Sequence, residues 1–352
     1  MIKKLFIAAL MAMAVAACSK DEAAKKMDSS EKVTAHLSVS PYEIVTKNTN
    51  ANHGNNRYLD SVRTIDVLVF REGGALEAYK QFNVNDAGGM NLSNLPVSVT
   101  VGNKTIYVVA NSKEASWAGV VRESSFLNLV VSLQKENLTT FTMAAKTTVN
   151  LQGDQVVNIV LKKLVAKVVV KGIKTDFAGG PYEGMSLRNA KLYLINVSGA
   201  KTYMGEDPAT KVILNRGGYS GTDYAGCLMT SMFAEDAPGL IGDSGYSTVH
   251  HFYCYENLLE TETATDRFTR LVLEANLDGT VYYYPIDINQ PGYGWTASVG
   301  HKGVKRNTCY TYSFTITGPG ADTPESKVEL KTITVNASVE SLSDTPEYTV
   351  TF

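Results

Sequence analysis

Apolar and polar residues alternate in short runs along most of this chain, with glycine, proline and asparagine between the runs. From Val33 onward, Ala35, Leu37 and Val39 recur at every second position, and the alternation stops at Pro41. A period of two is typical of a strand with one buried face. The pattern therefore predicts a half-buried β-strand near the start of the chain.

Further short apolar runs predict strands through the rest of the sequence. The predicted strands cover residues 62–70, 79–84, 97–101, 105–110, 147–151, 156–161, 164–170, 190–197, 250–255, 270–274, 280–288 and 308–316. A turn at Gly102 and Asn103 predicts that two of them, 97–101 and 105–110, form a hairpin. Residues 117–134 alone have a helical period, which predicts one or two short helices there.

Two alternating segments end the chain after residues 318–320, Gly-Pro-Gly, and a polar stretch at 321–326 that we expect to be a hinge. Apolar side chains at every second position share one face of the first segment: Ile333, Val335, Ala337 and Val339. The pattern by itself favours strands that complete a second sandwich. It is also compatible with a stripe that fills a groove elsewhere.

Length and composition place these strands in an all-β, two-domain protein. The chain has 352 residues, 28 glycines, 19 tyrosines and a net charge of −2. A chain of this length exceeds the usual limit for one core. The charge gives no reason to expect a nucleic-acid partner. We expect domains at 33–163 and 164–352, each with enough strands for one β-sandwich.

The first 18 residues have the order of a secretory signal. Lys3 and Lys4 precede a 13-residue apolar run, which is too short to span a bilayer, and small residues then lead to Cys18. The cysteine favours a lipoprotein signal over an ordinary one. Cys18 would be acylated and become the new N-terminus, with polar residues 19–32 as a flexible tether.

A polar loop follows the first predicted strand. Residues 46–57 are almost entirely polar or glycine and end at Arg57. Exposed loops of this kind are where proteases cut. Residues 33–57 therefore predict one strand and one loop that a single cleavage would detach.

Candidate chemistry elsewhere is weak. The cysteines Cys227, Cys254 and Cys309 allow one disulfide and a free thiol but no disulfide scaffold. We find no metal-ligand spacing, phosphate loop or nucleophile motif, and expect no cofactor and no catalysis. Tyrosine-rich runs at 253–256 and 282–287 would suit a carboxylate site or a sugar platform, but ordinary sheet surface explains them better.

Several blocks in a fixed order resemble the type V fimbrillins, the major pilus subunits of Bacteroidales. The blocks are residues 62–70, 105–111, 161–167, 252–257, 305–310 and 314–320, the last followed by Asp-Thr-Pro-Glu at 322–325 and the two terminal strands. The resemblance covers most of the chain from Cys18 onward. Its last block is the most specific.

The resemblance implies two transthyretin-like (Ig-like) sandwiches in tandem and assembly by donor-strand exchange. An arginine-specific protease would cut after Arg57, so that the mature protein begins at Tyr58 and lacks its first strand. Segment 327–352 of a neighbouring subunit would then fill the vacated groove. Arg63 and Arg71 are weaker processing candidates, because the former enters a core strand and the latter follows it.

Three classes of function follow. The leading hypothesis is a shaft subunit of an adhesive fimbrium, first an outer-membrane lipoprotein and then extracellular, whose partners are further copies of itself and accessory pilins. The second is a pilus anchor or a tip adhesin that binds a host or bacterial surface ligand. The third, an enzyme or a glycan-binding lipoprotein, has the least support.

Overall fold

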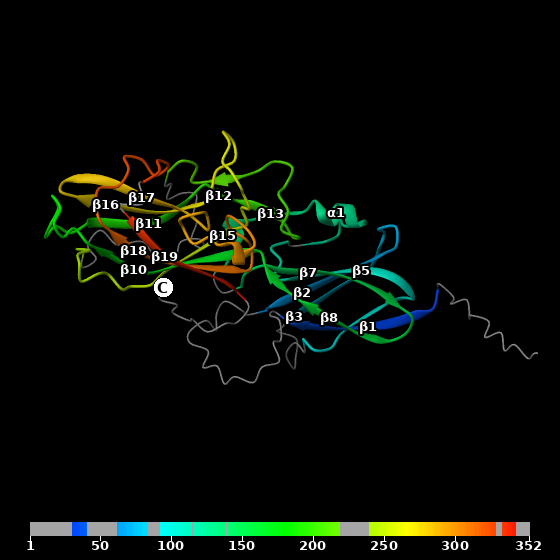
Figure 1. The fold of residues 1–352 in the computed structure, drawn as a ribbon. Coiled ribbons are helices and arrows are strands. Elements are labelled where there is room, and N and C mark those ends of the chain that lie inside the picture. Colours follow the sequence, from blue (N-terminus) through cyan, green and yellow to red (C-terminus); the bar gives the residue numbers. More distant parts are fainter. Residues whose placement is uncertain are drawn as a thin grey trace, which may run out of the picture.

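The computed structural model describes residues 30–40, 62–83, 92–114, 116–137, 140–218, 239–328 and 333–342. Strands dominate these residues, and helix is confined to single turns. The predicted all-β fold is therefore confirmed. Figure 1 shows an elongated molecule with β1, β2, β3, β5, β7 and β8 toward one end and β10, β11 and β15 to β19 toward the other.

The first group of strands forms two sheets that enclose a common core. A three-stranded sheet has the order β4-β1-β8 and a five-stranded sheet the order β3-β2-β5-β7-β9. The bounds are β1 Lys32–Ser40, β2 Thr64–Arg71, β3 Leu76–Asn83, β4 Leu95–Thr100, β5 Gly102–Ala110, β7 Met143–Leu151, β8 Gln155–Val160 and β9 Lys162–Lys163. Branched aliphatic side chains from both sheets fill the space between them, as expected for a sandwich.

The predicted hairpin at 97–110 is wrong. β4 and β5 are separated only by Val101, yet β4 pairs with β1 in one sheet and β5 pairs with β2 and β7 in the other. The chain crosses between the sheets at Gly102, whose φ of +106° favours glycine. A pair of alternating strands fits a hairpin and a crossing between sheets equally well, because the alternation specifies the faces of a strand and leaves its neighbours open.

The second group of strands also forms two main sheets, of order β15-β10-β18-β19 and β11-β16-β17. The bounds are β10 Val165–Thr175, β11 Arg188–Ile195, β12 Val197–Ser198, β13 Ala200–Thr202, β14 Ile213–Leu214, β15 His250–Tyr255, β16 Arg270–Leu277, β17 Thr280–Asp287, β18 Thr308–Ile316 and β19 Ile333–Ser341. Small sheets join β12 to β14 and β13 to β6, Val130–Ser132. The core is rich in tyrosine, leucine and valine.

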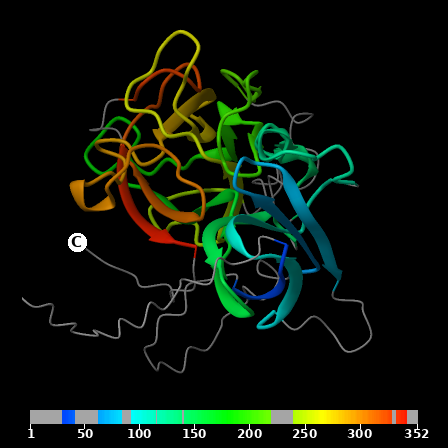
Figure 2. The ribbon, with the colours of Figure 1, turned by 90° about the vertical axis from the view of Figure 1, so that its right-hand side faces the viewer.

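Residues from both groups meet in an aromatic cluster at the outer face of the five-stranded sheet. Phe70 and Tyr107 of that sheet contact Phe126 of the short helix α1 (Glu123–Leu127). The ring centroid of Trp117 lies 5.3 Å from that of Tyr203, which follows β13. Figure 2 shows the strands of both groups in a view along the length of the molecule. The predicted boundary at 163 and 164 stays a prediction, and the β6-β13 pairing crosses it.

The region predicted to be helical holds α1, the strand β6 and a 3-10 turn η1 at Leu133–Lys135. The expectation of short helices is therefore correct for two segments. β6 was not anticipated, because its partner β13 lies about 70 residues away in sequence and local periodicity carries no signal of so distant a pairing.

Candidate functional site

β1 is the central strand of the three-stranded sheet. It pairs antiparallel with β4, from Lys32 opposite Thr100 to Leu37 opposite Leu95, and parallel with β8. At its end the Leu161 backbone N–H donates to the Ser40 carbonyl oxygen at 2.8 Å. β1 therefore supplies ladder hydrogen bonds to the strands on both of its sides.

The inward side chains of β1 belong to the core of the first sandwich. Val33 is 5% exposed, Val39 is 4% exposed, and Ala35 and Leu37 are fully buried. Val97 and Val99 of β4 and Val157 and Ile159 of β8 flank them in the same cluster. Loss of β1 would leave a groove with unpaired backbone groups along both walls and an apolar floor.

β19 lies at the edge of the four-stranded sheet. It pairs antiparallel with β18 alone, from Ile333 opposite Ile316 to Ser341 opposite Thr308. Ile333 is buried, and Val335, Ala337 and Val339 are partly buried against the second core, so the four predicted donor residues do share one face. In this structure that face covers the second sandwich of its own chain. A donor role for it stays a prediction.

The expected hinge at 321–326 is docked onto the second sandwich. Ala321 and Tyr283 exchange two backbone hydrogen bonds of 2.8 and 2.9 Å, and the Tyr284 hydroxyl donates to the Gly318 carbonyl oxygen at 3.0 Å. Glu325 accepts a bond from the Asn196 side chain, and Val328 is only 7% exposed. Polar composition suggested a free segment, but these polar groups have partners within the fold.

A polar cavity of about 620 Å³ lies where the two strand ends approach each other. β8 lines it through Val160, the strand residue opposite Ser40 of β1, and β19 lines it through its last residues. His301, Lys305 and Arg306 are among the other lining residues. Burial lowers the pKa of His301. The cavity links the C-terminal ends of β1 and β19 without bringing acid and base into a catalytic pair.

Cys18, Arg57 and Tyr58 lie outside the described residues, so lipidation and processing there stay predictions. The two weaker arginine candidates are inside the fold. The Arg63 backbone N–H donates to the Asn111 side chain at 2.8 Å, and the Arg71 guanidinium lies 3.3 Å from Glu77. Neither lies in an open loop of the kind that a protease needs.

The tyrosine-rich runs are mostly core, which corrects their interpretation as sheet surface. Tyr253 is 4% exposed and packs on Phe141, and Tyr255 is fully buried and donates to Glu136 at 2.8 Å. Tyr284 is also fully buried. The tyrosines are buried because both faces of these strands are covered. A period of two in the sequence therefore does not mean that one face of the strand is exposed to solvent.

The thiols and imidazoles show no metal or disulfide chemistry within the part of the chain that the structure describes. Cys254 and Cys309 lie on strands either side of β10 and are not joined in a disulfide, and burial raises the pKa of Cys254 to about 12. No group of three metal-ligating side chains comes together among the described residues. No helix in that part of the chain is long and apolar enough to cross a membrane.

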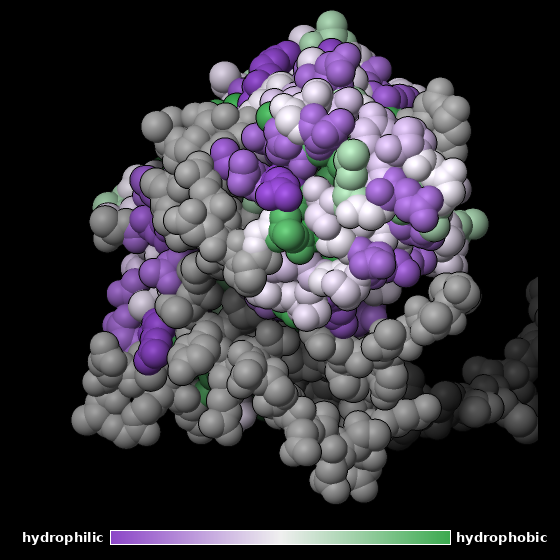
Figure 3. All heavy atoms as spheres, turned by 90° about the vertical axis from the view of Figure 1, so that its left-hand side faces the viewer, coloured by the Kyte–Doolittle hydropathy of each residue, from purple (hydrophilic) through white to green (hydrophobic). Residues whose placement is uncertain are grey.

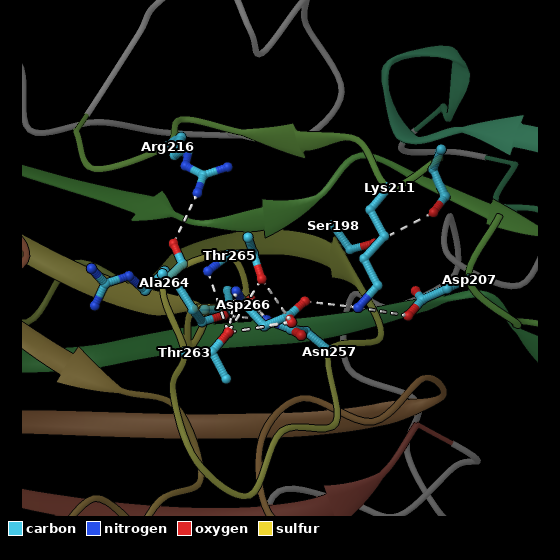
Figure 4. Close-up of polar contacts among 12 residues, drawn as sticks. Ser198, Asp207, Lys211, Arg216, Asn257, Thr263, Ala264, Thr265 and Asp266 are labelled. Carbon is cyan, nitrogen blue, oxygen red and sulfur yellow. Dashed lines mark hydrogen bonds and ion pairs between the residues drawn. The ribbon is translucent and has the colours of Figure 1, made fainter. Parts of the chain in front are cut away.

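A cluster of lysine and aspartate side chains lies on the loops that precede β14 and β16 (Figure 4). The Lys211 ammonium lies 2.8 Å from Asp266 and 3.4 Å from Asp207. A hydrogen bond from Lys211 lowers the pKa of Asp266, and Lys201 also pairs with Asp207. Both carboxylates are therefore neutralised by lysine, and the cluster ties two surface loops together.

Comparisons with known families give two matches that together span most of the fold. A model of the major fimbrial subunit protein (FimA) family matches residues 35–211, and a model of the FimA4 pilin C-terminal domain matches residues 258–341. The first match covers 177 of the 352 residues. It includes β1 from Ala35 onward and the whole of β4 and β8, which flank β1 in its sheet.

Two relatives come from Porphyromonas gingivalis. The major fimbrium subunit FimA type-5 is 30% identical over 160 residues, which are 41% of this chain and 40% of that protein. The major fimbrium subunit FimC is 24% identical over 334 residues, which are 91% of this chain and 67% of that protein. The match to FimA type-5 thus spans less than half of that relative.

Solved structures share the fold. A protein from Parabacteroides distasonis, provisionally classed as a cell adhesion protein, aligns with a TM-score of 0.64 at 19% identity and covers 90% of this chain and 98% of that one. A fimbrilin (FimA) of P. gingivalis W83 aligns with a TM-score of 0.59 at 16% identity, covering 91% and 99%. The chain belongs to the major fimbrial subunit (FimA) family, a family of structural subunits and not of enzymes.

Proposed function

We propose that this chain is a shaft pilin of an adhesive surface fimbrium that polymerises by donor-strand exchange. It is exported as an outer-membrane lipoprotein through Cys18 and is activated when an arginine-specific protease cuts after Arg57. The mature subunit begins at Tyr58. Its partners are other copies of itself and accessory pilins.

The position of β1 is the observation that carries this proposal. β1 is a central strand and the first of the strands that the structure describes, and the segment 41–61 connects it to β2. One cut in that segment separates the strand from the chain. Burial of Val33, Leu37 and Val39 contributes about 1.5–3 kcal/mol each. Loss of β1 therefore exposes an apolar groove, which favours binding of another strand.

β19 has the properties of the replacement strand. It has nine residues, as β1 does, and carries apolar side chains at four alternating positions. Because β19 lies at the edge of its sheet, it can leave that sheet when its backbone hydrogen bonds to β18 break. Donation from one copy to the next is a head-to-tail contact that does not close, so it builds a filament.

Replacement of the processing arginine tests the proposal. Arg57→Ala is expected to leave a lipid-anchored monomer that retains β1 and forms no filaments, as seen by electron microscopy and by mass of the surface protein. Arg63→Ala is the matched control and is expected to be processed and assembled normally. Normal filaments from Arg57→Ala would overturn cleavage at Arg57 as the switch.

A further inference from the structure

We infer that the incoming β19 lies in the groove in the direction of β1 and shifted by two residues, so that Ala337 takes the place of Ala35. This inference rests on the proposed function and adds the direction and register of the donor strand. Val335 then replaces Val33 and Val339 replaces Leu37.

The direction follows from where the strands begin and end. The ends of β1 and β19 both lie at the junction of the two sandwiches, beside the polar cavity. In Figure 1, β1 starts at the right-hand end of the molecule and β19 starts in its left-hand part. When copies add end to end, the donor chain leaves its own sandwich after the docked Val328 and reaches the acceptor at the Lys32 end. Ile333 thus stays nearest the donor, and the strand runs as β1 does.

The register follows from side-chain size. Ala35 is the one small residue in the inward stripe of β1, and it is fully buried between Val97 of β4 and Gln155 of β8. Interiors are closely packed, so the space beside an alanine is filled by its neighbours and rejects a larger side chain. Ala337 is likewise the one small residue in the stripe of β19.

An unshifted register fits poorly at two adjacent positions. With Ile333 in the place of Val33, Val335 would crowd the site of Ala35 and Ala337 would leave a cavity at the site of Leu37. The two-residue shift replaces both faults with one lost methylene, Val339 for Leu37, and with a serine in place of the last valine of the stripe, Val39. It places Ser341 in the position of Val39, where the groove ends next to the polar cavity.

The shift leaves a linker of six residues before the first inserted side chain. Six residues, 329–334, separate Val328 from Val335, and six extended residues span about 20 Å. Ile333 then lies beyond the place of Val33, at the position of Glu31. The backbone N–H of the buried Val101 donates to the Glu31 carbonyl oxygen there, so Ile333 meets an apolar neighbour and a free donor.

The surface at the outer end of the second sandwich agrees with recognition by an inserted strand. In Figure 3 the coloured surface of that end is mostly hydrophilic or neutral, with hydrophobic residues in small patches. Permanent interfaces built from flat surfaces alone are large and more hydrophobic than this. The proposed contact between copies therefore rests on the side chains that enter the groove.

Cysteine cross-linking within filaments tests the register. Thr34 of β1 lies opposite Ser98 of β4. The shifted register puts Asn336 in the place of Thr34, the unshifted register puts Thr334 there, and a reversed strand with Ala337 at the same site puts Ser338 there. Ser98→Cys is combined in turn with Asn336→Cys, Thr334→Cys and Ser338→Cys, and mildly oxidised filaments are run on non-reducing gels. Ser98→Cys alone controls for the native thiols.

The inference predicts a ladder of covalent oligomers for the Asn336→Cys pair only. A ladder from the Thr334→Cys pair or the Ser338→Cys pair, or filaments with no ladder in any pair, overturns it while leaving donor-strand exchange intact. Failure of the unmutated processed subunit to form filaments would instead overturn the proposed function.

A peptide competition separates the groove from the resting position of β19. Ala337 also packs on Gly294 in its own chain, where a side chain on that glycine would come within 2.6 Å, so a larger residue at 337 disturbs the resting subunit as well. A synthetic peptide of residues 331–343 avoids this problem. It is expected to block growth of processed subunits, with Ala337→Leu at least tenfold weaker and Val339→Leu at least equal. A stronger Ala337→Leu peptide would overturn the register.

Discussion

At the scale of single residues, the second sandwich encloses a charged group that its neighbours must neutralise. Arg270 is 2% exposed, and its guanidinium donates to Asp287 at 2.5 Å and to Glu262 at 2.7 Å. Burial raises the pKa of Asp287, and the adjacent Arg270 opposes that rise. The arginine therefore makes a buried carboxylate tolerable at neutral pH.

Arg270→Leu is expected to lower the free energy of unfolding by about 3–5 kcal/mol at pH 7, because it leaves Asp287 buried without its cation. The loss should shrink as pH falls. A carboxyl group whose folded pKa lies above its unfolded pKa destabilises the fold when ionised, and protonation below the folded pKa removes that cost.

Denaturant titrations at pH 5 and pH 7 measure both effects. The control is Arg267→Leu, in which the arginine is 38% exposed and 3.8 Å from Glu262, and it should change stability by no more than about 0.5 kcal/mol. Equal losses in the free energy of unfolding at the two pH values would contradict the explanation that ionised Asp287 causes the loss.

At the scale of elements, the proposed cleavage leaves β1 in the precursor only, whereas its neighbours β4 and β8 remain in both the precursor and the filament. Leu37→Ala removes a fully buried side chain, so the precursor should lose about 2–5 kcal/mol of stability. Filaments of the same variant should match unmutated filaments, because β1 is absent from them. Denaturant titrations of the precursor and of the filaments measure the two stabilities, through unfolding of the precursor and dissociation of the filaments.

Leu95→Ala is the matched control, since Leu95 lies opposite Leu37 on β4, which remains as a wall of the groove. It should weaken precursor and filament alike. Weaker filaments from Leu37→Ala would mean that β1 is retained, contrary to the account.

A chain that stops after Val328 keeps the docked segment and lacks β19. We expect a folded, processed subunit that accepts a donor strand but has none to give, so that it ends filaments when mixed with the complete subunit. Circular dichroism and protease resistance would establish the fold, and filament length against the mixing ratio would establish capping. Full-length filaments made from the truncated chain alone would exclude β19 as the donor.

Sequence reasoning predicted strands well and their neighbours poorly. The alternation from Val33 to Val39 gave the right face for β1, since one buried side produces a period of two. The same evidence failed at Gly102, because pairing partners are set by contacts distant in sequence. Tyr255 and Tyr284 were misplaced for a related reason, since a tyrosine whose hydroxyl finds a buried acceptor needs no solvent.

The candidate site divides in the same way. The stripe from Ile333 to Val339 was predicted from its period alone. That it rests on its own sandwich in this structure, against Gly294, depends on a close backbone approach that the sequence does not reveal.

At the scale of the whole molecule, the aromatic cluster joins the two sandwiches. Tyr203 is 1% exposed, lies 5.3 Å from Trp117 and 6.3 Å from Phe126, and shares a hydrogen bond with Ser112. Such contacts between sequentially distant strands should make the halves unfold together.

Tyr203→Ala is expected to cost about 3–5 kcal/mol and to split one calorimetric transition into two. The control is Tyr79→Ala, at a tyrosine that is 43% exposed on β3 of the first sandwich, and it should leave a single transition. A single transition in Tyr203→Ala would show that the other contacts between the halves, such as the β6-β13 pairing and the hydrogen bond from Tyr255 to Glu136, are sufficient to couple them.

In this account one cleavage after Arg57 removes both the lipid and the first strand, because Cys18 and β1 both precede Arg57. The N-terminal residue of the protein in filaments sheared from the cell surface is therefore the most direct test. Edman degradation or mass spectrometry of purified filaments should find Tyr58, with residues 1–57 absent. Acylated Cys18 at the start of the filament protein would contradict the account, since the groove would then still hold its own strand.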